Sequence, residues 1–211
     1  MKIEQCKKYD YFASSVYELK KPNFLESVNK VSDEYLTKSK IIDELDQIHP
    51  VVMTEHYFND ERIKEFSSYV VQTAWNILQS QGYAMKNSQT FFLEMWTQEH
   101  HKSSDMQQHI HGNNAQIVAF YFLNAPKDSS KLIFHDSRLA KIISNLPEEN
   151  VLNATNASTM VNFTPEAGTL ILTNSYIPHS FSRHKSDEPL KFIHMSIGVS
   201  SIQNNTLPEI I

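Results

Sequence analysis

The sequence predicts an α+β fold in which N-terminal helices buttress a double-stranded β-helix of the jelly-roll (cupin-like) kind. Two helical patterns come first along the 211-residue chain, and short runs rich in aromatic and β-branched residues follow Gly82. Helices first and many short strands later are typical of α+β folds with a strand-rich barrel. We expect one domain, with a mainly helical buttress over residues 1–85, the barrel core over 86–200 and a tail over 201–211.

Two helices are predicted before Gly82. Over residues 22–35, apolar side chains recur at helical spacing, and Pro22 stands at the start, where a helix tolerates proline. The second helix has Asn59 and Asp60 as N-cap candidates, one continuous apolar face, and Gly82 as its stop signal. Between the two, residues 47–58 have no assigned structure.

The second half of the chain predicts consecutive strands. Its aromatic and β-branched runs are separated by polar or proline-containing stretches, as strands are by turns. The predicted strands cover residues 90–96, 116–123, 131–134, 159–163, 169–173, 179–182 and 190–199. Residues 139–146 lie in a long connection and predict a helical turn that covers the barrel.

Composition limits the classes of partner. The chain has 19 basic and 24 acidic residues, a net charge of -5, and no dense cluster of Lys or Arg. We therefore expect no nucleic-acid partner. No apolar run of about 18 residues is present, so we expect no membrane partner and a cytoplasmic protein. The sequence leaves the oligomeric state open.

Three histidines predict a metal site. His109 and His111 are two residues apart, and side chains at that spacing on a strand project from the same face, so their imidazoles can converge on one ion. His179 follows Pro178 at the entrance of a predicted strand and is the candidate for the third ligand. Imidazole suits iron, zinc, copper and nickel. Other histidines are interpreted as ordinary surface or core residues, namely His49, His56, His100, His101 and His184.

Two further residues are candidates for binding a small dicarboxylate. Lys191 begins a strand twelve residues after His179, on the face that it shares with Ile193 and other apolar residues. A lysine at the mouth of an apolar barrel could hold a carboxylate by charge-assisted hydrogen bonds, and the alternative is a solvated lysine at a strand end. Tyr121 could add a phenolic hydrogen bond to the same carboxylate, or it is a core aromatic residue.

Several motifs extend this pattern over residues 24–199, nearly the whole chain. They are Glu94-Met-Trp96, Gln108-His-Ile-His-Gly112, Phe120-Tyr-Phe-Leu123, Phe134-His-Asp-Ser-Arg138, Asn174-Ser-Tyr-Ile-Pro-His179 and Pro189-Leu-Lys-Phe-Ile-His194. With these motifs the chain resembles the Fe(II)/2-oxoglutarate-dependent oxygenase superfamily, of the prolyl-4-hydroxylase-like kind. Within that superfamily it is most similar to a group of oxygenases that marine bacteriophages encode, which implies the host cytoplasm as its location.

The resemblance implies a single oxygenase domain that binds Fe(II), 2-oxoglutarate and molecular oxygen. The implied reaction is hydroxylation of a C–H bond in a protein or small-molecule substrate, with release of succinate and CO2, and the sequence does not identify that substrate. The catalytic metal ligands would be His109, His111 and His179. Lys191 falls where the superfamily places the Lys or Arg that holds the distal carboxylate of 2-oxoglutarate, and Tyr121 is the candidate from the sequence for a further hydrogen bond to that carboxylate.

Two positions depart from the superfamily pattern. His111 stands where these proteins usually have Asp or Glu, and Ser137 replaces an expected proline. A neutral imidazole in place of a carboxylate leaves Fe(II) with a net charge of about +2. Asp105 or Asp136 is an alternative source of the missing carboxylate. A further alternative is that only the other two histidines bind, with water in the remaining position.

The same histidines fit a rival class of protein. Three imidazoles with an open position are also a zinc arrangement, so the chain could be a non-oxidative, cupin-like metal protein that uses zinc or nickel as an isomerase, a hydrolase or a binding module. A third alternative is a degenerate oxygenase fold retained for a structural or interaction role. Metal analysis and titration with 2-oxoglutarate discriminate among the three.

Overall fold

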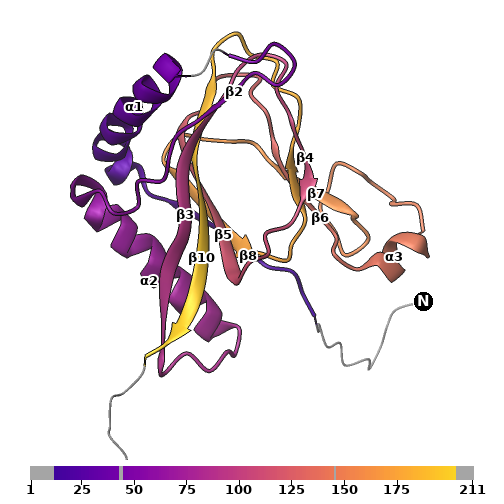
Figure 1. Cartoon of the computed structure of the whole chain (residues 1–211). Coiled ribbons are helices and arrows are strands. Elements are labelled where there is room, and N and C mark those ends of the chain that lie inside the picture. The colour runs from indigo at the N-terminus through magenta and orange to yellow at the C-terminus, as the bar shows by residue number, and fades with distance from the viewer. Residues whose placement is uncertain (1–11, 43–44, 145, 203–211) are drawn as a thin grey trace, which may run out of the picture.

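The fold consists of two antiparallel sheets and two long helices (Figure 1). The structure is a computed structural model, and it describes residues 12–42, 45–144 and 146–202. The helical elements are η1 (Pro22–Phe24), α1 (Leu25–Ile42), η2 (Glu61–Ile63), α2 (Lys64–Ser80) and α3 (Leu139–Ile143). The strands are β1 (Val16–Lys20), β2 (Val51–Met53), β3 (Ser88–His100), β4 (Met106–His109), β5 (Ala115–Asn124), β6 (Leu132–His135), β7 (Met160–Phe163), β8 (Thr169–Asn174), β9 (His179–Phe181) and β10 (Leu190–Ser201).

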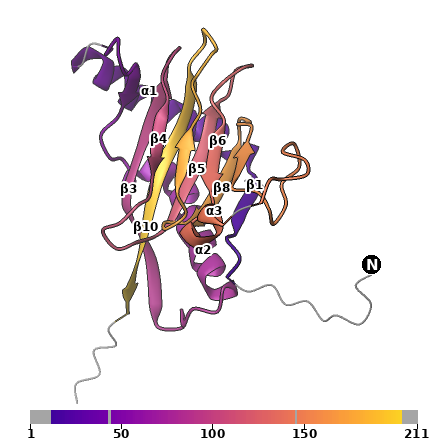
Figure 2. The ribbon, with the colours of Figure 1, turned by 90° about the vertical axis from the view of Figure 1, so that its right-hand side faces the viewer.

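The described strands form a larger, six-stranded sheet and a smaller, four-stranded one. The larger sheet has the order β1-β8-β5-β10-β3-β2, and the smaller has the order β4-β9-β6-β7. Helices α1 and α2 lie against one face of the larger sheet, and the smaller sheet lies across from its other face (Figure 1). Figure 2 shows the molecule from the side of the smaller sheet, with α2 behind the sheets. This arrangement confirms the predicted fold class.

Two apolar clusters fill the spaces on the two sides of the larger sheet. The helix-side cluster packs α1 and α2 against one face and includes Phe66, Ile77, Met95, Tyr121 and Ile193. The inter-sheet cluster lies between the two sheets and includes Phe120, Phe122, Phe134, Phe181 and Phe192. Because successive side chains of a strand point to opposite faces, β5 and β10 contribute to both clusters.

The second predicted helix is present with its predicted cap and stop. The Asp60 carboxylate accepts a hydrogen bond from the backbone N–H of Arg62 (3.0 Å) at the start of η2, and α2 follows directly. Phe66, Val70 and the other buried residues of α2 form its apolar face. Gly82 has a φ of 95°, a left-handed conformation that glycine adopts without strain, and it ends the helical segment. The first helix continues to Ile42, beyond its predicted end at residue 35.

The predicted strands are all present, although their ends shift by a few residues. The short strands β1, β2 and β4 are not among the predictions, and β1 and β2 join the larger sheet from within the predicted helical buttress. Helix α3 has no buried residue, so this turn does not cover the barrel as expected. In the part of the chain that is described, no helix has the length and apolar character needed to cross a membrane.

Candidate metal centre

Three histidines converge at one end of the smaller sheet. The pairing of β4 with β9 places His109 directly opposite His179. His111 lies just beyond β4, where its backbone N–H donates to the carbonyl of Ser175 (3.1 Å). One ring nitrogen from each histidine lies within 4.8 Å of those of the other two, and the Nε2 atoms of His111 and His179 are 3.3 Å apart. The structure therefore brings together the three residues that the sequence singles out as metal ligands.

Backbone carbonyls fix the protonation pattern of two of these rings. His109 Nδ1 lies 2.8 Å from the carbonyl oxygen of Gln107, and His179 Nδ1 lies 3.1 Å from that of Ile177. A carbonyl oxygen only accepts, so each Nδ1 carries the proton and donates it. Each Nε2 is then left with a free lone pair. A metal-binding histidine typically has its second nitrogen held by such an oxygen.

Burial disfavours a positive charge on two of the three rings. Burial lowers the pKa of His179 to about 3, and it lowers the pKa of His111 to about 4, with the nearby His109 ring adding to both shifts. Both imidazoles are therefore neutral at pH 7, which is the form that binds metals. His179 is fully buried, whereas His109 and His111 are partly exposed. The three nitrogens fit a divalent ion of the kind that prefers imidazole.

Neither candidate carboxylate is part of this cluster, whose members among the described residues are histidines only. Asp136 instead accepts hydrogen bonds from Arg138 Nε (2.9 Å) and Nη2 (2.8 Å), and the Lys141 ammonium lies 3.1 Å away. These contacts hold the pKa of the Asp136 carboxyl well below its usual range. Asp105 is exposed and lies outside the cluster.

The two predicted dicarboxylate-binding residues lie on the other face of the larger sheet. Lys191 donates to the carboxylate of Asp33 on α1 (2.5 Å). The Tyr121 hydroxyl donates to the carbonyl of Lys21 (2.7 Å), and its ring packs 4.9 Å from that of Phe66. The structure therefore does not bring Lys191 or Tyr121 together with the histidines. Their assignment to 2-oxoglutarate stays a prediction that this geometry does not favour.

Two residues that sequence reasoning missed do face the cluster from β10. His194 Nε2 lies 3.2 Å from His111 Nε2, and the Ser196 hydroxyl lies 3.4 Å from His111 Nδ1. Both alternate along the strand with the helix-side residues Ile193 and Met195. Because β10 is buried on both faces over most of its length, its sequence shows which residues share a face but not which face meets the helices.

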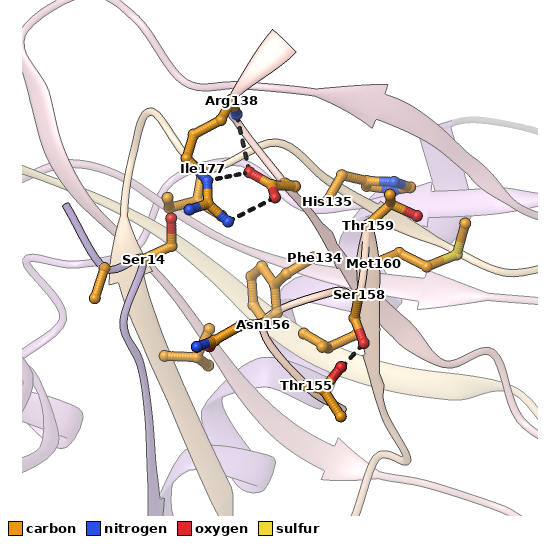
Figure 3. Close-up of a pocket in the computed structure, with 14 residues that line it drawn as sticks. Ser14, Phe134, His135, Arg138, Thr155, Asn156, Ser158, Thr159, Met160 and Ile177 are labelled. Atoms are coloured by element: carbon orange, nitrogen blue, oxygen red, sulfur yellow. Dashed lines mark hydrogen bonds and ion pairs between the residues drawn. The ribbon is translucent and has the colours of Figure 1, made fainter. Parts of the chain in front are cut away.

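A cavity of about 300 Å³ opens beside β6 and β7 of the smaller sheet. Phe134 and Ile177 line it, and both also contact His179: the Phe134 and His179 ring centroids are 6.2 Å apart, and Ile177 accepts the Nδ1 hydrogen bond. Figure 3 shows Arg138 at this cavity. Its Nη2 donates to the Asp136 carboxylate (2.8 Å). No described residue accepts a hydrogen bond from Arg138 Nη1. The cavity is within the size range of small-ligand sites.

Comparison with known proteins agrees with this geometry. A family model described as "Putative 2OG-Fe(II) oxygenase" matches residues 94–191, the segment that contains His109, His111 and His179. No curated protein sequence matches the chain. A prolyl-4-hydroxylase from Pseudomonas putida shares the fold at 11% identity, covering 87% of this chain and 92% of its own, with a TM-score of 0.59.

Two further solved structures share the fold. The viral collagen prolyl hydroxylase of Paramecium Bursaria Chlorella virus-1, solved with 2-oxoglutarate, matches at 10% identity over 86% of this chain and 94% of its own, with a TM-score of 0.55. The α-ketoglutarate-dependent epimerase SnoN from nogalamycin biosynthesis matches at 10% identity over 94% of this chain and 84% of its own, with a TM-score of 0.56. The family match, the fold and the histidine cluster together support Fe(II), 2-oxoglutarate and O2 as metal, co-substrate and oxidant.

Proposed function

We propose that this chain, which has the sequence signature and the fold of the prolyl-hydroxylase-like 2OG-Fe(II) oxygenases, hydroxylates a C–H bond of a protein or small-molecule substrate. The reaction would consume 2-oxoglutarate and O2 and release succinate and CO2. The observation that carries the proposal is the convergence of three imidazoles, two of which have their Nε2 lone pairs fixed by carbonyl contacts.

His109, His111 and His179 would hold the Fe(II), each through Nε2. The bound ion, together with 2-oxoglutarate, would supply the oxidising chemistry. The protein would orient the reacting groups and exclude water from them. Gln107 and Ile177 orient two of the rings through their carbonyls. The inter-sheet cluster excludes water on the inner side of His179, where the Phe120 ring lies 5.2 Å from the imidazole.

We further propose that a carboxylate of 2-oxoglutarate or of the substrate binds at Arg138. Arg138 and Lys141 face a single carboxylate, Asp136, so this group of three keeps a net positive charge. Asp136 also orients the guanidinium, which lowers the entropy lost when a second carboxylate binds. In Arg138→Met, the 2-oxoglutarate concentration for half-maximal succinate release should rise about tenfold if the co-substrate binds there. An unchanged value would assign Arg138 to the substrate alone or to neither.

Anaerobic titration tests the main proposal. Protein loaded with Fe(II) should develop the weak visible charge-transfer band of a chelate when 2-oxoglutarate is added, and should form succinate when air is admitted. His179→Ala should show neither signal, and His101→Ala, which removes a histidine outside the cluster, should show both. Wild-type protein that binds Fe(II) but gives neither the band nor succinate would contradict the oxygenase proposal.

A non-oxidative zinc or nickel protein is the second candidate, because the cluster contains three imidazoles and no carboxylate among the described residues. This composition also suits a metal site that activates water or a carbonyl group. Protein purified with one equivalent of tightly held zinc, and no response to 2-oxoglutarate after exchange to Fe(II), would favour it.

A further inference from the structure

An acidic residue, Glu94, lies on the inner face of the larger sheet close to the histidine cluster. Its neighbour on β3, Met95, belongs to the helix-side cluster, so the alternation of side chains along the strand directs Glu94 and Trp96 to the inner face. The Trp96 ring confirms this orientation. It packs 4.3 Å from the ring of His194, whose Nε2 lies 3.2 Å from that of His111.

The pairing of β3 with β10 places Glu94 on the Nδ1 side of His111. Its direct partner across the two strands is Ser196. Side chains in such a pair have Cβ atoms about 4.5–5.5 Å apart. The Ser196 hydroxyl in turn lies 3.4 Å from Nδ1 of His111. Burial and the His109 ring lower the pKa of His111 to about 4, and the negative charge of Glu94 acts in the opposite direction, so this charge reaches the ring.

The Glu94 carboxylate has no partner in the described part of the chain. It is partly buried, yet it forms no hydrogen bond or ion pair with any described residue. Glu99 on the same strand differs, because Lys40 Nζ lies 2.6 Å and His101 Nε2 lies 2.8 Å from its carboxylate. A partly buried carboxylate without a positive partner is unfavourable. A divalent ion at the three histidines would supply the missing positive charge.

The ion in turn would lack a negative neighbour among its ligands. An imidazole ligand brings no negative charge, so three of them leave Fe(II) with a net charge of about +2, whereas a carboxylate ligand would lower it to about +1. Asp105 and Asp136 lie outside the cluster. Glu94 can supply a negative charge from outside the ligands, and the open positions of the ion then stay available to the co-substrates.

We propose that Glu94 is a positioning residue that balances the charge of the metal centre without binding the ion, in place of the carboxylate ligand for which His111 is substituted. This inference rests on the proposed metal site and adds a residue of the opposite sheet to it. The carboxylate attracts the ion and repels the doubly charged 2-oxoglutarate. It should therefore strengthen metal binding and weaken the later binding of 2-oxoglutarate. A residue that only supports the fold would not act in opposite directions on the two.

Cobalt(II) is the probe for the test, because its visible d–d bands report its ligands and change when 2-oxoglutarate binds. Metal-free wild type, Glu94→Gln, Glu94→Asp and Glu65→Gln are titrated with Co(II), and then with 2-oxoglutarate at saturating Co(II). Folding is checked by near-UV circular dichroism. Glu65→Gln is the matched control, because it changes the net charge equally in the exposed first turn of α2, on the helix side of the larger sheet (Figure 1).

The two titrations should change in opposite directions. Glu94→Gln should bind Co(II) about tenfold more weakly, with the d–d bands of the wild type because the ligands are the same. Its cobalt form should bind 2-oxoglutarate about twofold or more tightly, because the repulsion is removed. Glu94→Asp keeps the charge and should lie closer to the wild type in both titrations, and Glu65→Gln should match the wild type.

Other results overturn the proposal in distinct ways. Altered d–d bands in Glu94→Gln would make Glu94 a ligand, and weaker binding of both Co(II) and 2-oxoglutarate would make it a support of the fold. Unchanged affinities would leave the carboxylate for a cationic group of the substrate. If Glu94→Gln does not fold, Glu94→Thr replaces it with the same criteria, because threonine suits a strand.

Failure of the proposed function gives a different result from failure of this inference. Wild-type protein that does not bind Co(II) would refute the three-histidine site, and the role of Glu94 with it. Wild-type protein that binds Co(II) but not 2-oxoglutarate would contradict the oxygenase proposal, and the Co(II) affinities of the variants would then decide the role of Glu94 alone.

Discussion

The two faces of the larger sheet differ in chemistry although the same strands form both. On the helix side, β5 and β10 contribute Tyr121 and Lys191, which bond to Lys21 and to Asp33 of α1. On the inner side, the neighbouring residue Phe120 and nearby His194 pack around the three clustered histidines. Adjacent residues of one strand therefore point to opposite faces, one toward the helices and the other toward the histidine cluster. Chemistry can be assigned to a strand residue here only after its face is known.

The two faces should also differ in what they control. The helix side holds a large apolar cluster, so its residues should determine the free energy of unfolding. The inner side places buried imidazoles among phenyl rings, so its residues should determine metal binding and the response to acid. Substitutions on one face and then the other can test this separation.

The largest expected effect is on metal affinity, at His179. Replacing it with Ala removes the most buried of the three predicted ligands and should weaken metal binding by roughly 100-fold or more. Isothermal titration of the metal-free protein with Ni(II) measures the change. His101→Ala is the control, because His101 pairs with Glu99 and not with the cluster. Equal affinities in wild type and His179→Ala would place the metal elsewhere.

The next effect is on stability, at Phe66 of the helix side. This ring is 1% exposed and packs against Phe24 and Tyr121, at centroid distances of 5.6 and 4.9 Å. Phe66→Ala should lower the free energy of unfolding by about 3–5 kcal/mol, because it leaves a cavity in the core. Urea denaturation of metal-free protein measures this loss. The folded fraction should keep its Ni(II) affinity within about twofold, and a larger change would show that the two faces are coupled.

The sequence predicts the site better than it predicts the orientation of the strands around it. The cluster can be predicted from the spacing of His109 and His111 and from the position of His179. Helices α1 and α2 can be predicted from the helical periodicity of their apolar residues. Strand β10 is buried on both faces over most of its length, so its apolar run shows no alternation that marks which side meets the helices. For this reason the sequence wrongly orients the Lys191 side chain toward the histidine cluster, and it does not identify His194 as a neighbour of that cluster.

Other unpredicted features have similar causes. Strands β1, β2 and β4 are three to five residues long, too short for a period-two pattern to stand out. Gly168 shows a constraint that only the fold reveals: its φ is 80°, and a Cβ there would lie 2.9 Å from the Cα of Pro22. The turn before β8 thus depends on a contact with the distant residues that start the first helix. Such a contact between distant residues cannot be predicted from the sequence around Gly168.

A smaller effect concerns acid stability, at His100 of the inner side. Burial lowers the pKa of His100 to about 3, against about 6.5 in the unfolded chain. The unfolded state therefore binds the extra proton first, so the stabilisation is complete above pH 6.5 and is lost as the pH falls toward 3. At pH 5 the loss from this residue is about 2 kcal/mol.

His100→Phe should remove that contribution. The difference in unfolding free energy between pH 7 and pH 5, measured by urea denaturation, should be smaller in the variant than in the wild type. Other buried histidines contribute equally to both proteins, so the difference isolates His100. Equal pH dependence in the two proteins would mean that His100 accepts a proton in the folded state.

The smallest effect is expected for the ion pair between Lys191 and Asp33. The Asp33 side chain is 59% exposed, so solvent screens the pair, and either Lys191→Met or Asp33→Asn should change the free energy of unfolding by only about 0–1 kcal/mol. If Lys191 serves only this pair, both variants should keep the wild-type affinity for 2-oxoglutarate in the anaerobic titration. If Lys191 holds the distal carboxylate, as the sequence predicts, Lys191→Met alone should lose that affinity, and Asp33→Asn should keep or strengthen it because the lysine is released. The second result would require β10 or the Lys191 side chain to turn toward the inner face when the co-substrate binds, and it would remove the separation between the two faces at this end of the sheet.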